Sequence, residues 1–182
     1  FTAITRSRAW VRICGVGSQF DILMEEFNKC KDNDFRLDFK CPNAKEMNVI
    51  SPTWYRLTDT AGNISSLADE SYVQRAHDLG LQVWALIDNF DQNVSTYDLL
   101  VSSAARDVLI DNMMAEAHKY GFDGWNIDFE TLTSKTGPHY IQFIKELSVR
   151  CRQEGIVLSV DNYVPASYNE FYDLASQGEV VD

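Results

Sequence analysis

The stretch GFDGWNIDFE, residues 121–130, alternates polar and apolar side chains with a period of two. Asn126, Asp128 and Glu130 share one side of this pattern, and aromatic or aliphatic residues lie between them. Such alternation sorts side chains onto the two faces of a β-strand. The stretch therefore predicts a strand with one apolar face and one face that carries an amide and two carboxylates.

Helical patterns flank this strand on both sides. Residues 102–121 and 137–155 repeat apolar side chains near helical spacing, and each segment ends at a glycine. Further strands are predicted at residues 47–57, 81–90 and 156–165, and further helices at residues 65–80 and 167–178. Strands and helices that alternate at this spacing predict βαβ units and a parallel sheet.

The number of these units leaves two architectures open. About five strand–helix units can be placed in the 182 residues, whereas a closed (β/α)8 barrel has eight units in ~250 residues. An open five-stranded α/β sheet and a part of a TIM barrel both fit. A buried carboxylate costs free energy unless it is paired or has a catalytic or binding role. The polar face of residues 126–130 therefore favours the partial barrel, with a functional site at its mouth.

The composition restricts the partners of the chain. With a formal net charge of −11, nucleic acid is not an expected partner, because phosphate binding needs a basic patch. No apolar run approaches the ~20 residues that span a bilayer. The hydrophobic content of 45% predicts a single domain over residues 1–182, in which residues 1–46 are the hardest to assign.

The cysteines and histidines indicate no metal centre. Cys14, Cys30, Cys41 and Cys151 lack C-x-x-C spacing, and no histidine has the spacing of a metal ligand. We expect no metal and no cofactor, and we favour reduced, buried thiols over disulfides. The sequence begins without Met and without a signal pattern, so we expect the natural N-terminus to lie upstream.

Two carboxylates on one strand face can perform glycosidic chemistry. On a strand, Asp128 and Glu130 would be about 6.5–7 Å apart at Cα, close enough for each to influence the pKa of the other. One such group can donate a proton to a sugar linkage while the other stabilises charge. A neighbouring carboxylate and a partly apolar pocket raise the donor's pKa, as this role requires.

Four further residues are candidates for substrate binding. Trp54 and Tyr55 could stack on sugar rings, although core packing is an equally good interpretation. Asn89 and Tyr163 lie near the carboxyl ends of their predicted strands, where barrel enzymes bind ligands.

The motif DGWNIDFE resembles the strand-four signature of glycoside hydrolase family 18, D-G-x-D-x-D-x-E. Asp123, Gly124, Asp128 and Glu130 match it, and Asn126 departs from it at the first inner Asp. The segments NVISPTWYRLTDTAGNIS and AHDLGLQVWALIDNF are similar to a bacterial branch that includes spore-cortex and cell-wall lytic enzymes. The resemblance covers about residues 47–182.

This resemblance implies a glycosidase that cleaves β-linked N-acetylglucosamine polymers, either peptidoglycan and spore cortex or chitin-like chains, outside the cytoplasm. The substrate's own N-acetyl carbonyl would attack the anomeric carbon. Glu130 would protonate the leaving oxygen and later activate water, and Asp128 would orient the acetamido group. Asn126 would hydrogen-bond Asp128 and hold its rotamer, whereas Asp123 and Gly124 would be structural.

The resemblance also implies that parts of the site are missing. Family members typically supply a Tyr from the sixth strand and often a Trp from the eighth, and both would fall after Asp182. We therefore expect part of a catalytic domain, or a truncated product. Its exposed sheet edges predict self-association unless further chain completes the barrel.

Two other functions remain open. A non-catalytic module of the same fold could bind N-acetylglucosamine oligomers, although a pure binder does not need a proton donor. A metal-dependent hydrolase on an open α/β sheet could use Asp128 and Glu130 as ligands for Mg²⁺. The sequence disfavours that hydrolase, because no phosphate-binding Gly-rich loop accompanies the carboxylates.

Overall fold

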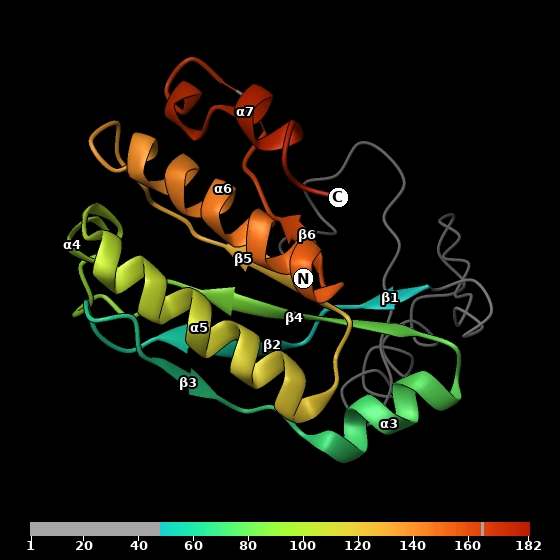
Figure 1. The fold of residues 1–182 in the computed structure, drawn as a ribbon. Coiled ribbons are helices and arrows are strands. Elements are labelled where there is room, and N and C mark those ends of the chain that lie inside the picture. Colours follow the sequence, from blue (N-terminus) through green and yellow to red (C-terminus); the bar gives the residue numbers. More distant parts are fainter. Residues whose placement is uncertain (1–47, 165) are drawn as a thin grey trace, which may run out of the picture. The chain divides into compact units, whose positions relative to one another are not determined.

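The computed structural model describes residues 48–164 and 166–182. Their strands form a six-stranded sheet in the order β3-β2-β4-β5-β6, and β1 pairs with β4 beside this path (Figure 1). All strand pairs are parallel except β2 with β3. The strands are β1 Val49–Ile50, β2 Thr53–Leu57, β3 Ile64–Ser66, β4 Gln82–Asp88, β5 Gly124–Asp128 and β6 Val157–Val160.

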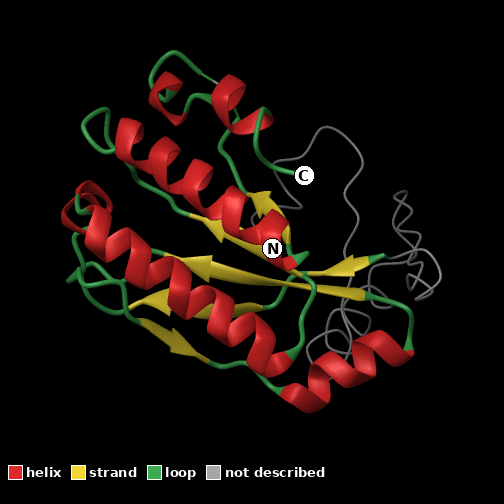
Figure 2. Ribbon diagram, in the orientation of Figure 1, coloured by secondary structure: helices red, strands yellow, loops and turns green. Residues whose placement is uncertain are grey.

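Two long helices, α5 and α6, lie side by side across one face of the sheet (Figure 1, Figure 2). The helices are α3 Glu70–Asp78, α4 Thr96–Val101, α5 Ser103–Tyr120, α6 Gly137–Glu154 and α7 Leu174–Gly178, with a 3₁₀ turn η2 at Glu170–Tyr172. The sheet and the helices enclose the core, where Trp125 and Ile127 are fully buried. Phe129 stacks on Phe143 of α6, with ring centroids 5.7 Å apart.

The central strand has the two faces that its alternation predicts, but it ends at Asp128, so Glu130 lies beyond the strand and not on it. The apolar residues of β5 face the helices, whereas Asn126 and Asp128 lie on the opposite face. The register pairs Asp128 with Asp88 of β4 and pairs Asn126 with Ser159 of β6. The polar side chains of three neighbouring parallel strands are therefore brought together on that face.

The predicted ends of α5 and α6 are confirmed. Ser102 is the N-cap of α5, and its side chain accepts a hydrogen bond from the backbone of Ala105. Gly121 and Gly155 end the two helices in the left-handed conformation, with φ of 68° and 71°, which glycine adopts without steric cost.

Other predictions fail at short elements. The helix predicted over residues 65–80 begins only at Glu70, because Ile64–Ser66 form β3 and pair with β2. Helix α4 was not predicted, and the helix predicted over residues 167–178 is divided into η2 and α7 by Asp173, with φ of 46°. Residues 1–46, which are the hardest to assign from the sequence, lie outside the described residues, and so do Cys14, Cys30 and Cys41.

Two sequence-based expectations can be examined directly. Cys151 is a free thiol, and burial raises its pKa to about 12. Within residues 48–164 and 166–182, none of the helices combines the length and the apolar character needed to cross a bilayer.

Candidate active site

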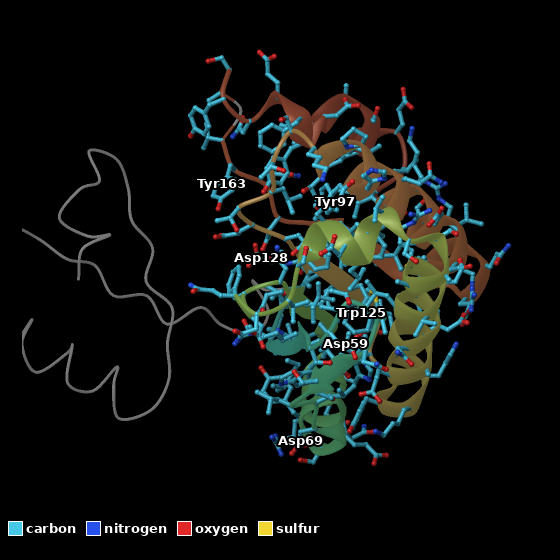
Figure 3. All side chains as sticks on the ribbon, turned by 90° about the vertical axis from the view of Figure 1, so that its left-hand side faces the viewer. Asp59, Asp69, Tyr97, Trp125, Asp128 and Tyr163 are labelled. Atoms are coloured by element: carbon cyan, nitrogen blue, oxygen red, sulfur yellow. The ribbon has the colours of Figure 1, made fainter. Side chains whose placement is uncertain are left out.

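Three aspartates gather at the carboxyl ends of neighbouring strands. Asp88 ends β4, Asp128 ends β5, and Asp161 directly follows β6. Because these strands are parallel, their carboxyl ends meet at one edge of the sheet, where barrel enzymes bind ligands. In Figure 3, Asp128 and Tyr163 lie at this edge, whereas Trp125 lies in the interior.

A cavity of about 190 Å³ opens at this edge. It is lined by Asp128, Phe129, Glu130, Asp161, Asn162, Tyr163 and Tyr172. The structure thus brings together three of the residues that the sequence predicts, Asp128, Glu130 and Tyr163. It adds Asp161, which the sequence analysis missed.

The environment of Asp128 favours its protonated form. Burial, followed by the carboxylates of Glu130, Asp161 and Asp88, raises the pKa of Asp128 to about 6. Like charges in a partly desolvated site disfavour a further negative charge. Asp128 therefore changes its ionisation close to neutral pH, where a reacting group is most useful.

The backbone of Glu130 is fixed by Asn89. The Glu130 N–H donates to Asn89 Oδ1 at 2.8 Å, and Asn89 Nδ2 donates to the Glu130 carbonyl at 3.0 Å and to Thr96 Oγ1 at 3.0 Å. The Asn89 side chain is therefore engaged by the protein itself. The structure gives Asn89 a positioning role, and because Asn89 also lines a cavity that borders Glu130, the substrate contact stays a prediction.

A buried tyrosine holds the residues around Glu130 from the other side. The Tyr172 hydroxyl donates to the carbonyl of Phe129 at 3.0 Å and accepts from the N–H of Leu132 at 3.4 Å. Between these contacts Thr131 has a φ of 53°, an uncommon conformation for a β-branched residue. Asn89 and Tyr172 together fix the turn that carries Glu130.

Asp88 is a buried carboxylate with a complete set of partners. Arg56 contacts both of its oxygens, at 2.6 Å and 3.0 Å, and the N–H of Phe90 donates to Asp88 Oδ1 at 3.0 Å. Such a bidentate pair offsets the cost of burying the charge. Neither Arg56 nor Asp88 was predicted from the sequence. A signal for the aspartates was present, because Asp88 and Asp161 each begin an Asp-Asn-aromatic triplet at the carboxyl end of a strand.

The amide of Asn126 bonds residues other than Asp128, the partner that we predicted. Its Nδ2 donates to Asp161 Oδ2 at 3.1 Å and to Ser51 Oγ at 3.2 Å. Among the described residues, its buried Oδ1 has no hydrogen-bond partner. No Asn126–Asp128 hydrogen bond is formed within the described residues, so the rotamer of Asp128 is not held in the way that we expected.

The structure places the three aromatic residues predicted to bind sugar in different environments. Tyr55 is 1% exposed and packs on Trp125, so its prediction as a sugar-binding residue is wrong. Trp54 packs edge-on against Tyr72 of α3, and it lines neither cavity that borders Glu130. Tyr163 does line the site, where burial and the neighbouring Glu130 carboxylate raise its pKa. Strand position alone could not separate Trp54 from Tyr55, because it does not say which face of β2 the helices cover.

A second, larger cavity borders Glu130 on the side of β4. Its volume is about 740 Å³, and it runs between the loop after β4 and the turn after β5. Phe90, which is 43% exposed, and Tyr97 supply aromatic surface there. The Lys135 Nζ lies 3.7 Å from the centroid of the Tyr97 ring. Glu130 therefore stands between two cavities.

The first two residues of the motif, Asp123 and Gly124, make contacts that stabilise the sheet. Asp123 accepts hydrogen bonds from the N–H of Val83 at 2.7 Å and contacts His77 Nε2 at 2.8 Å. A side chain at Gly124 would meet Trp84 at 2.8 Å and Val157 at 3.0 Å. Both positions fit the structural role that the sequence predicts. Within the described part of the chain, no group of three or more His, Cys, Asp or Glu side chains is placed to hold a metal ion.

The comparison with protein families agrees with this site. Residues 38–182 match the model of the glycosyl hydrolases family 18. The chain therefore belongs to this family, most of whose members are glycosidases. Among curated proteins no significant sequence match is found.

Solved structures share the fold. A sporulation-specific glycosylase, YdhD of Bacillus subtilis, is 24% identical with a TM-score of 0.64, over 73% of this chain and 47% of its own. A chitinase of Chromobacterium violaceum is 22% identical with a TM-score of 0.66, over 76% and 47%. The spore cortex-lytic enzyme SleL of Bacillus megaterium is 17% identical with a TM-score of 0.67, over 92% and 37%. The chain spans less than half the length of these structures, so its sheet corresponds to part of their barrel.

Proposed function

We propose that this chain carries the catalytic carboxylates of a glycosidase that cleaves β-linked N-acetylglucosamine polymers. One observation carries the proposal: Asp128 and Glu130 line one cavity at the carboxyl edge of a parallel sheet. Membership of family 18 supports the reaction class.

Glu130 is the proton donor in this proposal. The acetamido carbonyl oxygen of the substrate attacks the anomeric carbon, and the bond from that carbon to the leaving oxygen breaks. Glu130 gives its proton to the leaving oxygen, and its carboxylate then takes a proton from the water that opens the cyclic intermediate. The sugar thereby keeps its β configuration, and Glu130 returns to its starting state.

Asp128 orients the acetamido group and stabilises the positive charge of the cyclic oxazolinium. Burial and, after it, the carboxylates that surround Asp128 disfavour its ionisation and raise its pKa to about 6. A cation that forms among them relieves this repulsion. The site therefore favours the intermediate over the neutral substrate, which is the condition for catalysis.

The polymer chain would pass through both cavities at Glu130. Phe90 and Tyr97 offer aromatic surface for sugar rings in the larger cavity. The polymer is peptidoglycan, spore cortex or chitin, all of which lie outside the cytoplasm, so we propose an extracytoplasmic location.

The test is mass spectrometry of the products after incubation with peptidoglycan and, separately, with chitin oligomers. New N-acetylglucosamine reducing ends, absent with Glu130→Gln, would support the glycosidase and identify its polymer. Binding of the oligomers without any product would favour a non-catalytic sugar-binding module of the same fold. Activity that disappears on addition of a chelator would instead favour the metal-dependent hydrolase.

A further inference from the structure

We propose that Asp161 is a positioning residue of this site, which fixes the amide of Asn126 and sets the charge around Asp128 from the neighbouring strand. This inference rests on the proposed function, because the reaction defines the task of Asp128. It concerns a residue outside the motif that identifies the family.

The backbone places Asp161 firmly beside β5. Its N–H donates to the carbonyl of Ile127 at 2.9 Å, which continues the pairing of β5 with β6 by one residue. Its side chain accepts from Asn126 Nδ2 at 3.1 Å and lines the cavity together with Asp128 and Glu130. A carboxylate held by both its backbone and its side chain has little freedom to move.

The pairing with Asp161 gives a physical reason for the amide at position 126. Asn126 is 7% exposed, so its N–H groups need acceptors, and Asp161 and Ser51 supply them. An aspartate at position 126 would instead place a carboxylate against Asp161, with like charges in contact. The amide at position 126 and the acid at position 161 are therefore complementary.

Asp161 also acts on Asp128 through space. The acidic groups that face Asp128 are Glu130 in the turn after β5, Asp161 after β6 and Asp88 at the end of β4. The phenols of Tyr140, Tyr163 and Tyr172 complete the surroundings. Arg56 neutralises Asp88 through a bidentate pair. Asp161 instead bonds a neutral amide, and among the described residues no cation forms a salt bridge with it.

The direct test is the titration of the Asp128 carboxyl carbon by NMR in the wild-type chain, in Asp161→Asn and in Asp107→Asn. Asp107 lies exposed on α5 and matches the loss of one charge. Asp161→Asn should lower the midpoint of the Asp128 titration by on the order of 0.5–1 pH unit, and Asp107→Asn should not move it. An unchanged midpoint in Asp161→Asn would overturn the proposal.

A swap of the two side chains tests the pairing itself. Asn126→Asp and Asp161→Asn should each reduce kcat, by on the order of tenfold or more, whereas the double variant should recover part of that loss. Additive losses in the double variant would contradict the pairing. The NMR titration needs no turnover, so an inactive wild-type chain would count against the proposed function and leave the role of Asp161 to be judged separately.

Discussion

At the scale of single residues, Asp128 carries an unusual electrostatic cost. Its pKa is about 6, against 3.8 for an unperturbed aspartate, with burial as the first cause and three neighbouring carboxylates as the second. The folded chain therefore binds this proton more tightly than the unfolded chain does. Ionisation of Asp128 destabilises the fold progressively between about pH 4 and pH 6, and the full cost is present above pH 6.

Asp128→Asn should therefore stabilise the chain at neutral pH while it removes catalysis. We expect a gain of about 1–2 kcal/mol in the free energy of unfolding at pH 7, because partial exposure screens the repulsion, and no gain at pH 3. Urea unfolding at both pH values measures this difference. An equal effect at pH 3 and pH 7 would show that the charge of Asp128 is not the cause.

Asn89 illustrates how a residue outside the motif can control the proton donor. Asn89→Ala removes the two hydrogen bonds to the Glu130 backbone, so we expect kcat to fall about 10- to 100-fold with a smaller change in KM. Asn112→Ala is the matched control, because Asn112 also bonds a backbone carbonyl, that of Gly62, far from the site. A similar loss of activity in both variants would assign the Asn89 effect to general destabilisation.

At the scale of elements, the long segments could be predicted from the sequence and the short ones could not. Helices α5 and α6 have full apolar stripes, a proline or serine at the start and a glycine at the end, so several local signals agree. Strand β3 is three residues long and has no stripe of its own. It exists because the preceding turn, in which Asp59 accepts from the backbone of Ala61 and Asn63, folds it back onto β2.

That turn also makes a close contact with α5, which gives a test of the packing. Gly62 has a φ of 99°, and an added Cβ would meet the backbone of Ala105 at 2.5 Å and of Leu109 at 2.7 Å. Gly62→Ala should lower the free energy of unfolding by about 2–4 kcal/mol. Gly80→Ala is the control, with a φ of 74° and open space around it, and should cost only about 1 kcal/mol. Equal losses of stability in the two variants would mean that the turn at Gly62 does not pack tightly against α5.

In the candidate site too, some residues could be predicted from the sequence and others could not. Glu130 and Asp128 could be predicted because they lie two residues apart at and just beyond the end of one strand, and a period of two is visible in a single sequence. Asp161 follows β6 and Arg56 belongs to β2, and only the sheet order brings Asp161 beside β5 and Arg56 beside Asp88 of β4. Tyr55 was misassigned because strand alternation does not say which of the two faces is covered by helices.

At the scale of the whole molecule, the described sheet is part of a barrel and not a closed one. Strand β6 has β5 on one side, and on the other side Asp182 pairs with Leu158 through hydrogen bonds of 2.9 and 3.0 Å. Val164 and Tyr168, which follow β6 in the sequence, are 83% and 77% exposed. Exposed strand edges and apolar patches favour association.

We therefore expect this chain to self-associate in a concentration-dependent way. Tyr168→Lys should shift the equilibrium towards monomer in sedimentation velocity, because a charge in an apolar contact is costly. Val149→Lys on the outer side of α6 is the control and should leave the equilibrium unchanged. A chain that is monomeric at all concentrations would contradict this expectation.

The measurement that tests the central claim most directly is proton NMR of the anomeric configuration of freshly released reducing ends. With a polymer that the chain cleaves, we predict that the β-anomer appears first and that Glu130→Gln releases none. An α-anomer formed first would exclude substrate-assisted retention. Undiminished release by Glu130→Gln would contradict the role of Glu130 as proton donor.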